Sequence, residues 1–350
     1  MDLLKEIRDR IKANPGGEDA RGLKSVLTHI EIAERHYFRA KSERDEHLFT
    51  DVIYRTNHAY EGILKEAYVI LAERAADRVS PAAIEDYLLN SAKLRSRFTD
   101  LLTNYRRNWR NPSTHDYQLF FSEQESFLAI VTVSAFASIL LDHILEKIAY
   151  TQKSRELENA ALLARDHIKG FAALAPIDKV TQILLSYGSY YLKHFETMSK
   201  YSRRSANAQL AAFMEKVAPE ISLVREQEFN IDELRVQFDL VATVDERTVV
   251  IETRDPRSPD EILMGDDAAI MQLSRHLTVI GLEDGVVFFY PKQPDEEMVS
   301  AHSSSMWPQH LRLREVFSDD PSHYEFETDE NEEPPVDLVF DRIAREGELK

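Results

Sequence analysis

The chain has 350 residues, no cysteine, a formal net charge of −18, 43% hydrophobic residues and 30% charged residues. This length exceeds what one hydrophobic core usually serves, and the composition excludes a wholly disordered or fibrous chain. Without cysteine there can be neither disulfides nor thiolate metal ligands, which fits a reducing, cytoplasmic setting.

Hydropathy along the chain predicts no membrane partner. The amino-terminal segment is charged throughout, which is typical of neither a signal peptide nor a membrane span. The most apolar stretch, Phe127 to Leu141, contains Ser134 and Ser138 and is too short to cross a bilayer. We expect this stretch to be a buried core helix.

The negative charge is unevenly distributed. Residues 291–350 contain 16 acidic and 6 basic residues, so this tail carries over half of the excess. The segment from Lys93 to Arg110 has one acidic residue, Asp100, against six basic ones: Lys93, Arg95, Arg97, Arg106, Arg107 and Arg110. A basic stripe on an acidic chain indicates a local nucleic-acid footprint.

In chain order, the front part is predicted to be all-helical. Apolar residues recur at helical spacing from Leu48 to Ile70, and Ser80-Pro81 is a helix start preceding a helix from Ala82 to about Arg107. Because Pro112 disfavours helix at the residue before it, a loop should open near Asn111. We expect residues 1–150 to form a helical bundle.

The next helix also has a start signal. Ser122-Glu123-Gln124-Glu125 is a capping-box pattern before an apolar run from Phe127 to Ile148. Two further helices, Glu156 to Lys169 and Asp178 to Arg203, predict a helical linker or platform over residues 151–203.

A small α/β domain is expected over residues 204–295. A helix reaching Val217 is followed by β-rich runs and, before the last of them, by a helical stretch from Asp267 to Ile280. The β-rich runs are Ile221 to Phe229, Val236 to Val244, Thr248 to Thr253 and Val286 to Tyr290. In the acidic tail, residues 296–350, only Leu311 to Phe317 and Val336 to Ile343 are predicted to be structured.

The segment Asn108 to His115 combines an arginine, an amide and an imidazole between two long predicted helices. RNA cleavage without a metal needs a group that accepts the 2′-hydroxyl proton and a cation that neutralises the phosphorane. Histidine suits proton transfer because its ordinary pKa is near neutrality. Arginine suits the phosphate because its planar fork matches the oxygens and stays protonated.

Arg110-Asn111-Pro112-Ser113-Thr114-His115 resembles the Arg-x4-6-His motif of HEPN ribonucleases, and Glu61 with Lys65 is similar to their upstream Glu-x-x-x-Lys segment. The resemblance covers about Glu31 to Tyr150. It implies a homodimer whose two motifs face each other across a cleft, where Arg110 stabilises the phosphate, His115 transfers protons and Asn111 positions one of them. Cofactors are not needed, and products end in cyclic phosphate.

Simpler interpretations of this segment remain open. Glu61, Lys65, Arg106 and Arg107 are expected to support the site or bind RNA. Alternatively, Glu61 and Lys65 form an ion pair four residues apart on one helix, and the basic stripe is a solvated helix face. Many unrelated chains also contain Arg-x4-His by chance.

Two carboxylates in the rear part fall on consecutive predicted strands. If these strands form a hairpin turning at Asp245-Glu246, paired residue numbers sum to 491, which places Asp239 opposite Glu252. Because side chains alternate along a strand, Arg254 points to the same side as Glu252. The three groups therefore converge on one face.

This arrangement resembles the restriction-endonuclease-like fold and its PD-(D/E)xK motif, over about Ala206 to Pro291. The resemblance implies that Asp239 and Glu252 bind Mg²⁺, and Gln272 matches a glutamine sometimes found after the motif. However, Arg254 replaces the lysine, and an arginine does not readily lose its proton. A degenerate fold used for binding or sensing, and ordinary polar residues at a strand end, are the alternatives.

Three functional hypotheses follow. The first is a metal-independent endoribonuclease of prokaryotic anti-phage or toxin type, cleaving RNA such as tRNA, with the rear domain and tail sensing a trigger protein or restraining the front site. The second is a Mg²⁺-dependent DNA nuclease in which the helical half is a dimerisation scaffold. The third is a regulatory or binding subunit without enzymatic activity.

Overall fold

The computed structural model describes residues 3–13, 21–90, 96–116, 118–157, 168, 170–231, 234–255, 268–302 and 310–319. The chain divides into two compact units, Met1–Ala149 and Tyr150–Lys350. The first is helical and the second contains a mixed sheet, as the sequence predicts for the two halves. The boundary is one residue from the predicted position 150.

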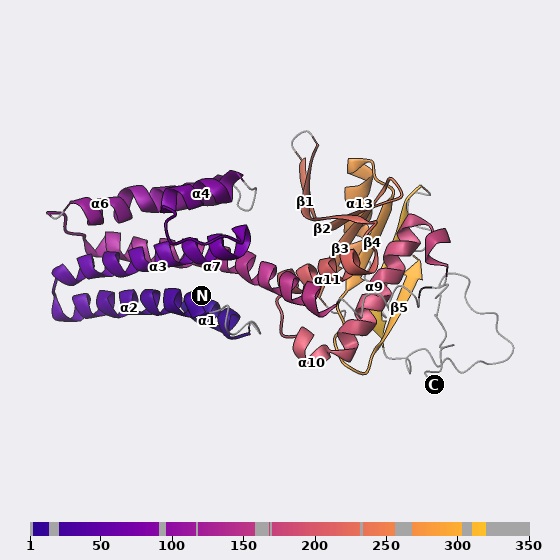
Figure 1. Ribbon diagram of the computed structural model, residues 1–350, viewed down its shortest axis with the longest axis horizontal. Coiled ribbons are helices and arrows are strands. Elements are labelled where there is room, and N and C mark those ends of the chain that lie inside the picture. The colour runs from indigo at the N-terminus through magenta and orange to yellow at the C-terminus, as the bar shows by residue number, and fades with distance from the viewer. Residues whose placement is uncertain are drawn as a thin grey trace. The chain divides into compact units, whose positions relative to one another are not determined.

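The helices of the first unit pack lengthwise, with α2 against α3 and α3 against α4 (Figure 1). Their bounds are α1 Leu3–Ala13, α2 Arg21–Glu43, α3 His47–Ala72, α4 Pro81–Asn90, α5 Ser96–Tyr105, the π-helical turn η1 Arg106–Arg110, α6 Asn111–His115 and α7 Glu123–Glu156. The last residues of α7 belong to the second unit.

Both predicted helix starts are confirmed. The Ala83 amide donates to the hydroxyl oxygen of Ser80 over 3.3 Å, before α4. At the start of α7, the Glu125 amide donates to Ser122 Oγ over 3.3 Å, while the Ser122 amide donates to Glu125 Oε2 over 2.8 Å. These reciprocal bonds satisfy amides that a helix end otherwise leaves unpaired.

Helix α7 supplies much of the first unit's core. Its buried residues from Ala129 to Ile148, including Phe136, pack with residues of α3 such as Tyr60 and Leu64, which confirms the prediction of a core helix. The helix that contains this stretch extends well beyond it, to 34 residues. By length and composition it is one helix in the described ranges that could span a membrane, and 56% of its most apolar window is buried.

The second unit is built on a six-stranded sheet with the order β1-β2-β3-β4-β6-β5. The strands are β1 Ser222–Ile231, β2 Leu234–Val244, β3 Arg247–Arg254, β4 Asp284–Phe289, β5 Glu297–His302 and β6 Arg312–Asp319. Strands β1, β2 and β3 pair antiparallel, β3 pairs parallel with β4 and β4 with β6, and β5 runs antiparallel to β6.

Helices cover both faces of this sheet. Apolar residues of α9 (Pro176–Lys193) and α11 (Arg203–Val217) form one core with Ile251, Phe288 and Val316. Helix α13 (Ala268–Ile280) forms a second core on the other face, with Val250 and Val287. The short elements η2 (Phe171–Ala173) and α10 (Phe195–Met198) complete the helical layer.

Two predicted boundaries in this unit are wrong. Residues 176–193, expected in a separate helical linker or platform, form α9, which packs on β3, β4, β5 and β6 and so belongs to the sheet domain. The expected helix to Arg203 ends at Lys193, and strands β5 and β6 extend the sheet into the predicted tail. Both segments join the sheet domain because their apolar residues are buried against the sheet. Most of Glu156 to Lys169 and all of Val336 to Ile343 lie outside the described residues.

The hairpin between β2 and β3 has the predicted register. Leu240 pairs with Ile251 and Val244 with Arg247, so paired numbers sum to 491. The turn residues Asp245 and Glu246 have φ of 48° and 64°, and this left-handed backbone matches the twist of a two-residue hairpin. Lys179 Nζ holds the Asp245 carboxylate at 2.5 Å.

Candidate functional site

The predicted loop at Asn111 is wrong, because the helix continues to His115. The Asn111 amide bonds to the Arg106 carbonyl five residues back, which closes a π-turn, and Asn111 itself is helical at φ −68° and ψ −48°. Proline has no amide hydrogen, and its ring normally clashes with the carbonyl four residues earlier. The wider π-turn before Pro112 accommodates the ring, so Arg110 and His115 lie on one helical segment.

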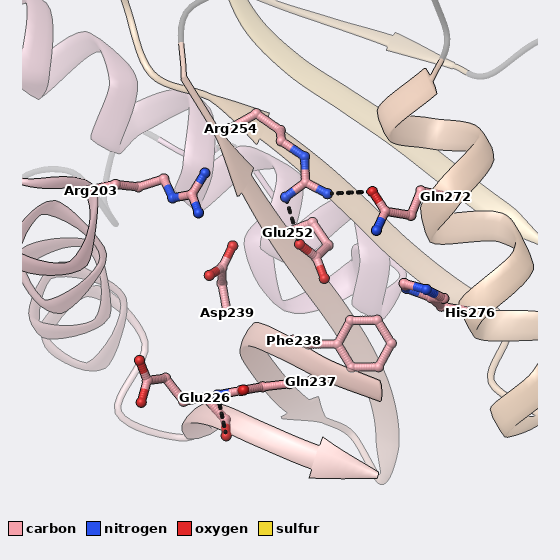
Figure 2. Close-up of a pocket in the computed structure, with 9 residues that line it drawn as sticks. All are labelled: Arg203, Glu226, Gln237, Phe238, Asp239, Glu252, Arg254, Gln272 and His276. Carbon is pink, nitrogen blue, oxygen red and sulfur yellow. Dashed lines mark hydrogen bonds and ion pairs between the residues drawn. The ribbon is translucent and has the colours of Figure 1, made fainter. Parts of the chain in front are cut away.

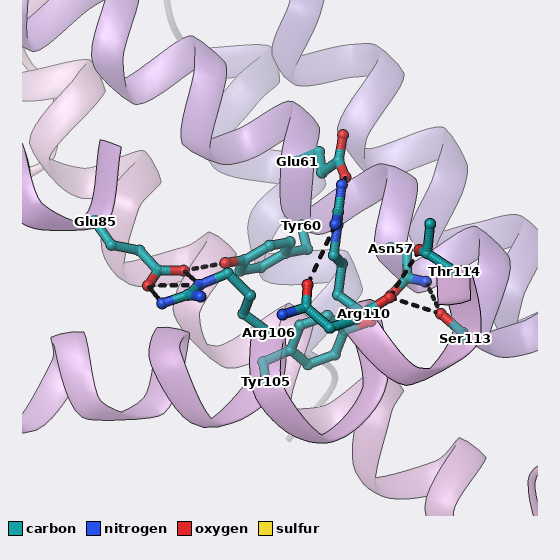
Figure 3. A network of polar contacts seen from close by, with 10 residues as sticks. Asn57, Tyr60, Glu61, Glu85, Tyr105, Arg106, Arg110, Ser113 and Thr114 are labelled. Carbon is teal, nitrogen blue, oxygen red and sulfur yellow. Dashed lines mark hydrogen bonds and ion pairs between the residues drawn. The ribbon is translucent and has the colours of Figure 1, made fainter. Parts of the chain in front are cut away.

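Arg110 points to α3 and is held by two side chains (Figure 3). Its Nε and a terminal nitrogen both lie 2.8 Å from Glu61 Oε1, and the other terminal nitrogen donates to Asn111 Oδ1 over 3.2 Å. The Arg110 side chain is 24% exposed. A guanidinium has five N–H groups, so two remain for a further acceptor.

A buried polar network ties the motif helix to α3. Asn57 Nδ2 donates to Ser113 Oγ over 2.7 Å, and Ser113 Oγ donates to the Arg110 carbonyl over 3.0 Å. The Tyr105 hydroxyl lies 3.0 Å from Asn57 Oδ1 and 2.7 Å from Thr56 Oγ1. Burial raises the pKa of Tyr105, so this hydroxyl stays protonated. The network fixes the backbone that carries Arg110.

Arg106 is bound to a buried carboxylate of the first unit, that of Glu85. Its guanidinium contacts both oxygens of Glu85 at 3.0 Å, and the Glu85 side chain is 2% exposed. Glu85 also accepts hydrogen bonds from Thr103 Oγ1 and Tyr60, and burial together with this bond raises the pKa of Tyr60. The Glu85 bond raises the pKa of Arg106 as well. Arg106 therefore holds η1 against α4.

His115 and Arg110 are not brought together within one chain. The His115 side chain is exposed and makes no hydrogen bond or ion pair within the described ranges. Five residues along an α-helix correspond to about 140° around the axis, so the two side chains diverge. Arg107 is also exposed. Lys65 forms no ion pair with the part of the chain described, and Glu61 instead binds Arg110.

The second unit has a polar pocket beside the middle of β2 and the carboxyl end of β3, with a cavity of about 330 Å³ (Figure 2). Three of the residues that line it were predicted to converge, and Gln272 joins them from α13. The full lining is Arg203, Glu226, Gln237, Phe238, Asp239, Glu252, Arg254, Gln272 and His276. The carboxyl ends of strands are common ligand sites in α/β folds.

The predicted acids have separate partners in this pocket. Asp239 Oδ2 accepts hydrogen bonds from the Thr253 amide and hydroxyl, both over 2.8 Å. Arg254 lies 2.9 Å from Glu252 Oε2 and donates to Gln272 Oε1 over 3.2 Å, which confirms the predicted common face. Burial, with the nearby charge of Asp239, raises the pKa of Glu252 to about 7.

Five lining residues were not identified from the sequence: Arg203, Glu226, Gln237, Phe238 and His276. Glu226 has a φ of 53° inside a strand, and it lies between the pairs Arg225–Leu240 and Gln227–Phe238, hence opposite Asp239. Pairing β1 with β2 in the sequence would have identified Glu226 as a third acid of the pocket. The burial of His276, followed by the charge of Arg254, lowers the histidine pKa.

The pocket does not fit a divalent cation in this arrangement. Magnesium prefers several oxygen ligands, usually including carboxylates and water. Here Arg254 occupies one oxygen of Glu252, and Thr253 occupies one oxygen of Asp239. In the ranges that the structure describes, no group of three or more histidines and carboxylates is placed to hold a metal. Mg²⁺ binding therefore stays a prediction of the resemblance.

Comparisons with protein-family models, curated proteins and solved structures found no match. The geometry of the two sites therefore carries the functional argument.

Proposed function

We propose that the first unit is a metal-independent endoribonuclease of HEPN type, with Arg110 and His115 as its catalytic residues. The observation that carries this proposal is the exposed imidazole of His115, free of partners in the described ranges, on the helical segment that also carries a held arginine. An imidazole in contact with solvent can exchange protons with a bound hydroxyl near neutral pH.

Arg110 contributes the positive charge in this mechanism. Glu61 and Asn111 fix its guanidinium through three N–H groups, which leaves two N–H groups for the oxygens of a phosphodiester. A donor fixed in advance costs less to orient in the transition state. Asn111 acts on the arginine, while exposed Arg107 is positioned to attract the RNA backbone.

A homodimer can bring an Arg110 and a His115 together even though the two side chains of one chain point apart. Because these side chains point about 140° apart on one helix, each needs a second motif to complete a site around one phosphate. Two copies related by a twofold axis present the same motif to each other. We therefore propose that the arginine of one protomer works with the histidine of its partner.

The second unit is proposed to be a degenerate restriction-endonuclease-like domain with a sensing role. Its order of α11, three antiparallel strands, α13 and a fourth strand parallel to β3 favours that fold. Arg254 at the lysine position and its contact with Glu252 favour sensing over cleavage. We place the chain among cytoplasmic prokaryotic anti-phage or toxin effectors that cleave RNA such as tRNA on a trigger protein's signal.

The test is cleavage of a mixed RNA substrate by the full chain in EDTA. Arg110→Ala and His115→Ala should each lower the rate at least a hundredfold, because a charge stabiliser or a proton-transfer group is lost. Arg39→Gln is the matched control, since it removes an exposed arginine of α2 and should leave the rate unchanged. Products should carry cyclic phosphate ends.

Two outcomes separate the alternatives. Cleavage of DNA that requires Mg²⁺ and is lost in Asp239→Ala would support the restriction-type nuclease instead. No cleavage of either nucleic acid, in EDTA or with Mg²⁺, would favour a regulatory subunit. Activity in EDTA that survives both motif substitutions would refute the proposed residues.

A further inference from the structure

The guanidinium of Arg203 and the carboxylate of Asp239 both line the rear pocket but form no ion pair with each other. Arg203 reaches in from the start of α11 and Arg254 from the end of β3, on either side of the Asp239 carboxylate (Figure 2). Arg203 makes no hydrogen bond or ion pair with any residue that the structure describes, although its side chain is exposed beside an acid. Unused donors are therefore directed at a small polar space.

Only one of the two oxygens of the Asp239 carboxylate accepts hydrogen bonds from the described residues. Asp239 Oδ2 receives two hydrogen bonds from Thr253, whereas Oδ1 receives none from the described residues. Arg254 has three contacts, to Glu252, the Thr253 carbonyl and Gln272, which leave two of its five N–H groups. A ligand held by Arg203, Arg254 and Asp239 must accept from two guanidinium groups and donate to the free oxygen of Asp239, with Glu226 and Glu252 also lining the space.

We infer that this pocket binds a phosphate monoester without a divalent cation. A singly protonated phosphate monoester has the required combination, because its free oxygens accept from Arg203 and Arg254 while its P–OH donates to Asp239 Oδ1. Sulfate and phosphodiesters have no such proton, so Asp239 repels them. The cavity of about 330 Å³ is at the small end of ligand pockets, which span roughly 300 to 1,000 Å³.

This inference does not depend on the ribonuclease proposal, since every residue it uses lies in the second unit. It differs from a magnesium nuclease site in the role of the arginine. Arg254 provides the positive charge beside Glu252 that a metal would otherwise provide. The phosphate can belong to a free nucleotide or to the phosphorylated end of a nucleic acid, and the probes below distinguish these sources.

The first experiment is isothermal titration calorimetry of the full chain in EDTA at about pH 6, near the second pKa of a phosphate monoester. The matched probes are AMP against 3′,5′-cyclic AMP, and inorganic phosphate against sulfate. The first of each pair should bind at least tenfold more tightly. A 5′-phosphorylated trinucleotide that binds more tightly than AMP would assign the site to nucleic-acid ends, and equal binding would assign it to nucleotides.

The second experiment uses variants with the same probes. Arg203→Gln should weaken AMP binding at least tenfold, while Arg247→Gln, which removes an exposed arginine at the opposite end of β3, should not. Asp239→Asn should raise the affinity for sulfate and bring the phosphate-to-sulfate ratio towards one. Equal binding of AMP and cyclic AMP, equal losses in the two arginine variants, or binding that requires Mg²⁺ would overturn the inference.

Discussion

Two buried glutamates, one in each unit, stand in opposite surroundings. Glu85 is 2% exposed and accepts from Arg106, Tyr60 and Thr103. Glu252 is 7% exposed, contacts Arg254 and faces the charge of Asp239. The first carboxylate has donors on both oxygens, whereas the second has one cationic partner and a like charge nearby.

This difference shows that a buried carboxylate can either stabilise a fold or take part in the chemistry of a pocket. A buried charge with a full set of donors stabilises a fold, because removing it leaves its partners unsatisfied. A buried acid with few donors keeps its proton to higher pH and responds to what enters its pocket. We therefore assign Glu85 to the support of the motif helix, and Glu252 to the wall of a responsive pocket.

The largest expected effect is on the front unit. Glu85→Ala should lower its free energy of unfolding by about 3 kcal/mol, because Arg106 and the buried Tyr60 lose their shared acceptor. Urea unfolding in a Trp307→Phe background isolates the fluorescence of Trp109, since the chain has two tryptophans. Asp51→Ala, which removes an exposed acid of α3, should change stability by less than about 0.5 kcal/mol. Equal losses of stability in Glu85→Ala and Asp51→Ala would contradict the structural role of Glu85.

The second effect is pH-dependent. A folded pKa of about 7 for Glu252, above the ordinary 4.5, means that the folded chain keeps a proton that the unfolded chain has lost. Between these values the free energy of unfolding falls as pH rises, by up to about 3 kcal/mol. Below 4.5 the contribution is fully present. Calorimetry at pH 5 and pH 8 should show Glu252→Gln gaining stability relative to the native chain at the higher pH.

The control for that measurement is Glu196→Gln, which removes an exposed acid of α10 in the same unit. Its stability relative to the native chain should not change over the same pH range. Carboxyl chemical shifts of Glu252 measured by NMR give the pKa directly. A midpoint near 4.5 would contradict the comparison of the two glutamates.

A smaller effect is expected at Ser113. Ser113→Ala removes the acceptor of buried Asn57 Nδ2 and should destabilise the front unit by about 1.5 kcal/mol. Thr114→Ala is the matched control, because its exposed hydroxyl bonds to the same Arg110 carbonyl over 2.8 Å and should cost about 0.5 kcal/mol. The same Trp109 unfolding assay measures both. Similar losses would show that the buried link to α3 adds nothing.

The smallest effect is stabilising. Glu246 has a φ of 64° in the β2–β3 turn, so Glu246→Gly should raise the free energy of unfolding of the second unit by up to about 1 kcal/mol. Glu246→Ala removes the same charge without relieving the backbone and should not stabilise. Thermal unfolding of the three chains measures this. A gain in the alanine variant alone would point to charge rather than backbone strain.

Local patterns predicted a large part of the fold. Ser80 and Ser122 start helices as expected, because a cap depends on residues three positions away. The register of β2 and β3 followed from a two-residue turn, which placed Asp239, Glu252 and Arg254 on one wall of the pocket. Sequence alone could not supply Arg203 or His276, since α11 and α13 reach the pocket from distant parts of the chain.

Sequence by itself determined the elements whose cause is local: caps, the hairpin turn and the apolar face of α7. Tertiary structure decided which partners the charged groups took. Glu61 binds Arg110 rather than Lys65, and the helix continues past Pro112 through a π-turn held by Asn57 and Ser113. Charges bind the partner that packing brings within reach, and residues separated along the chain meet only when the fold places them together.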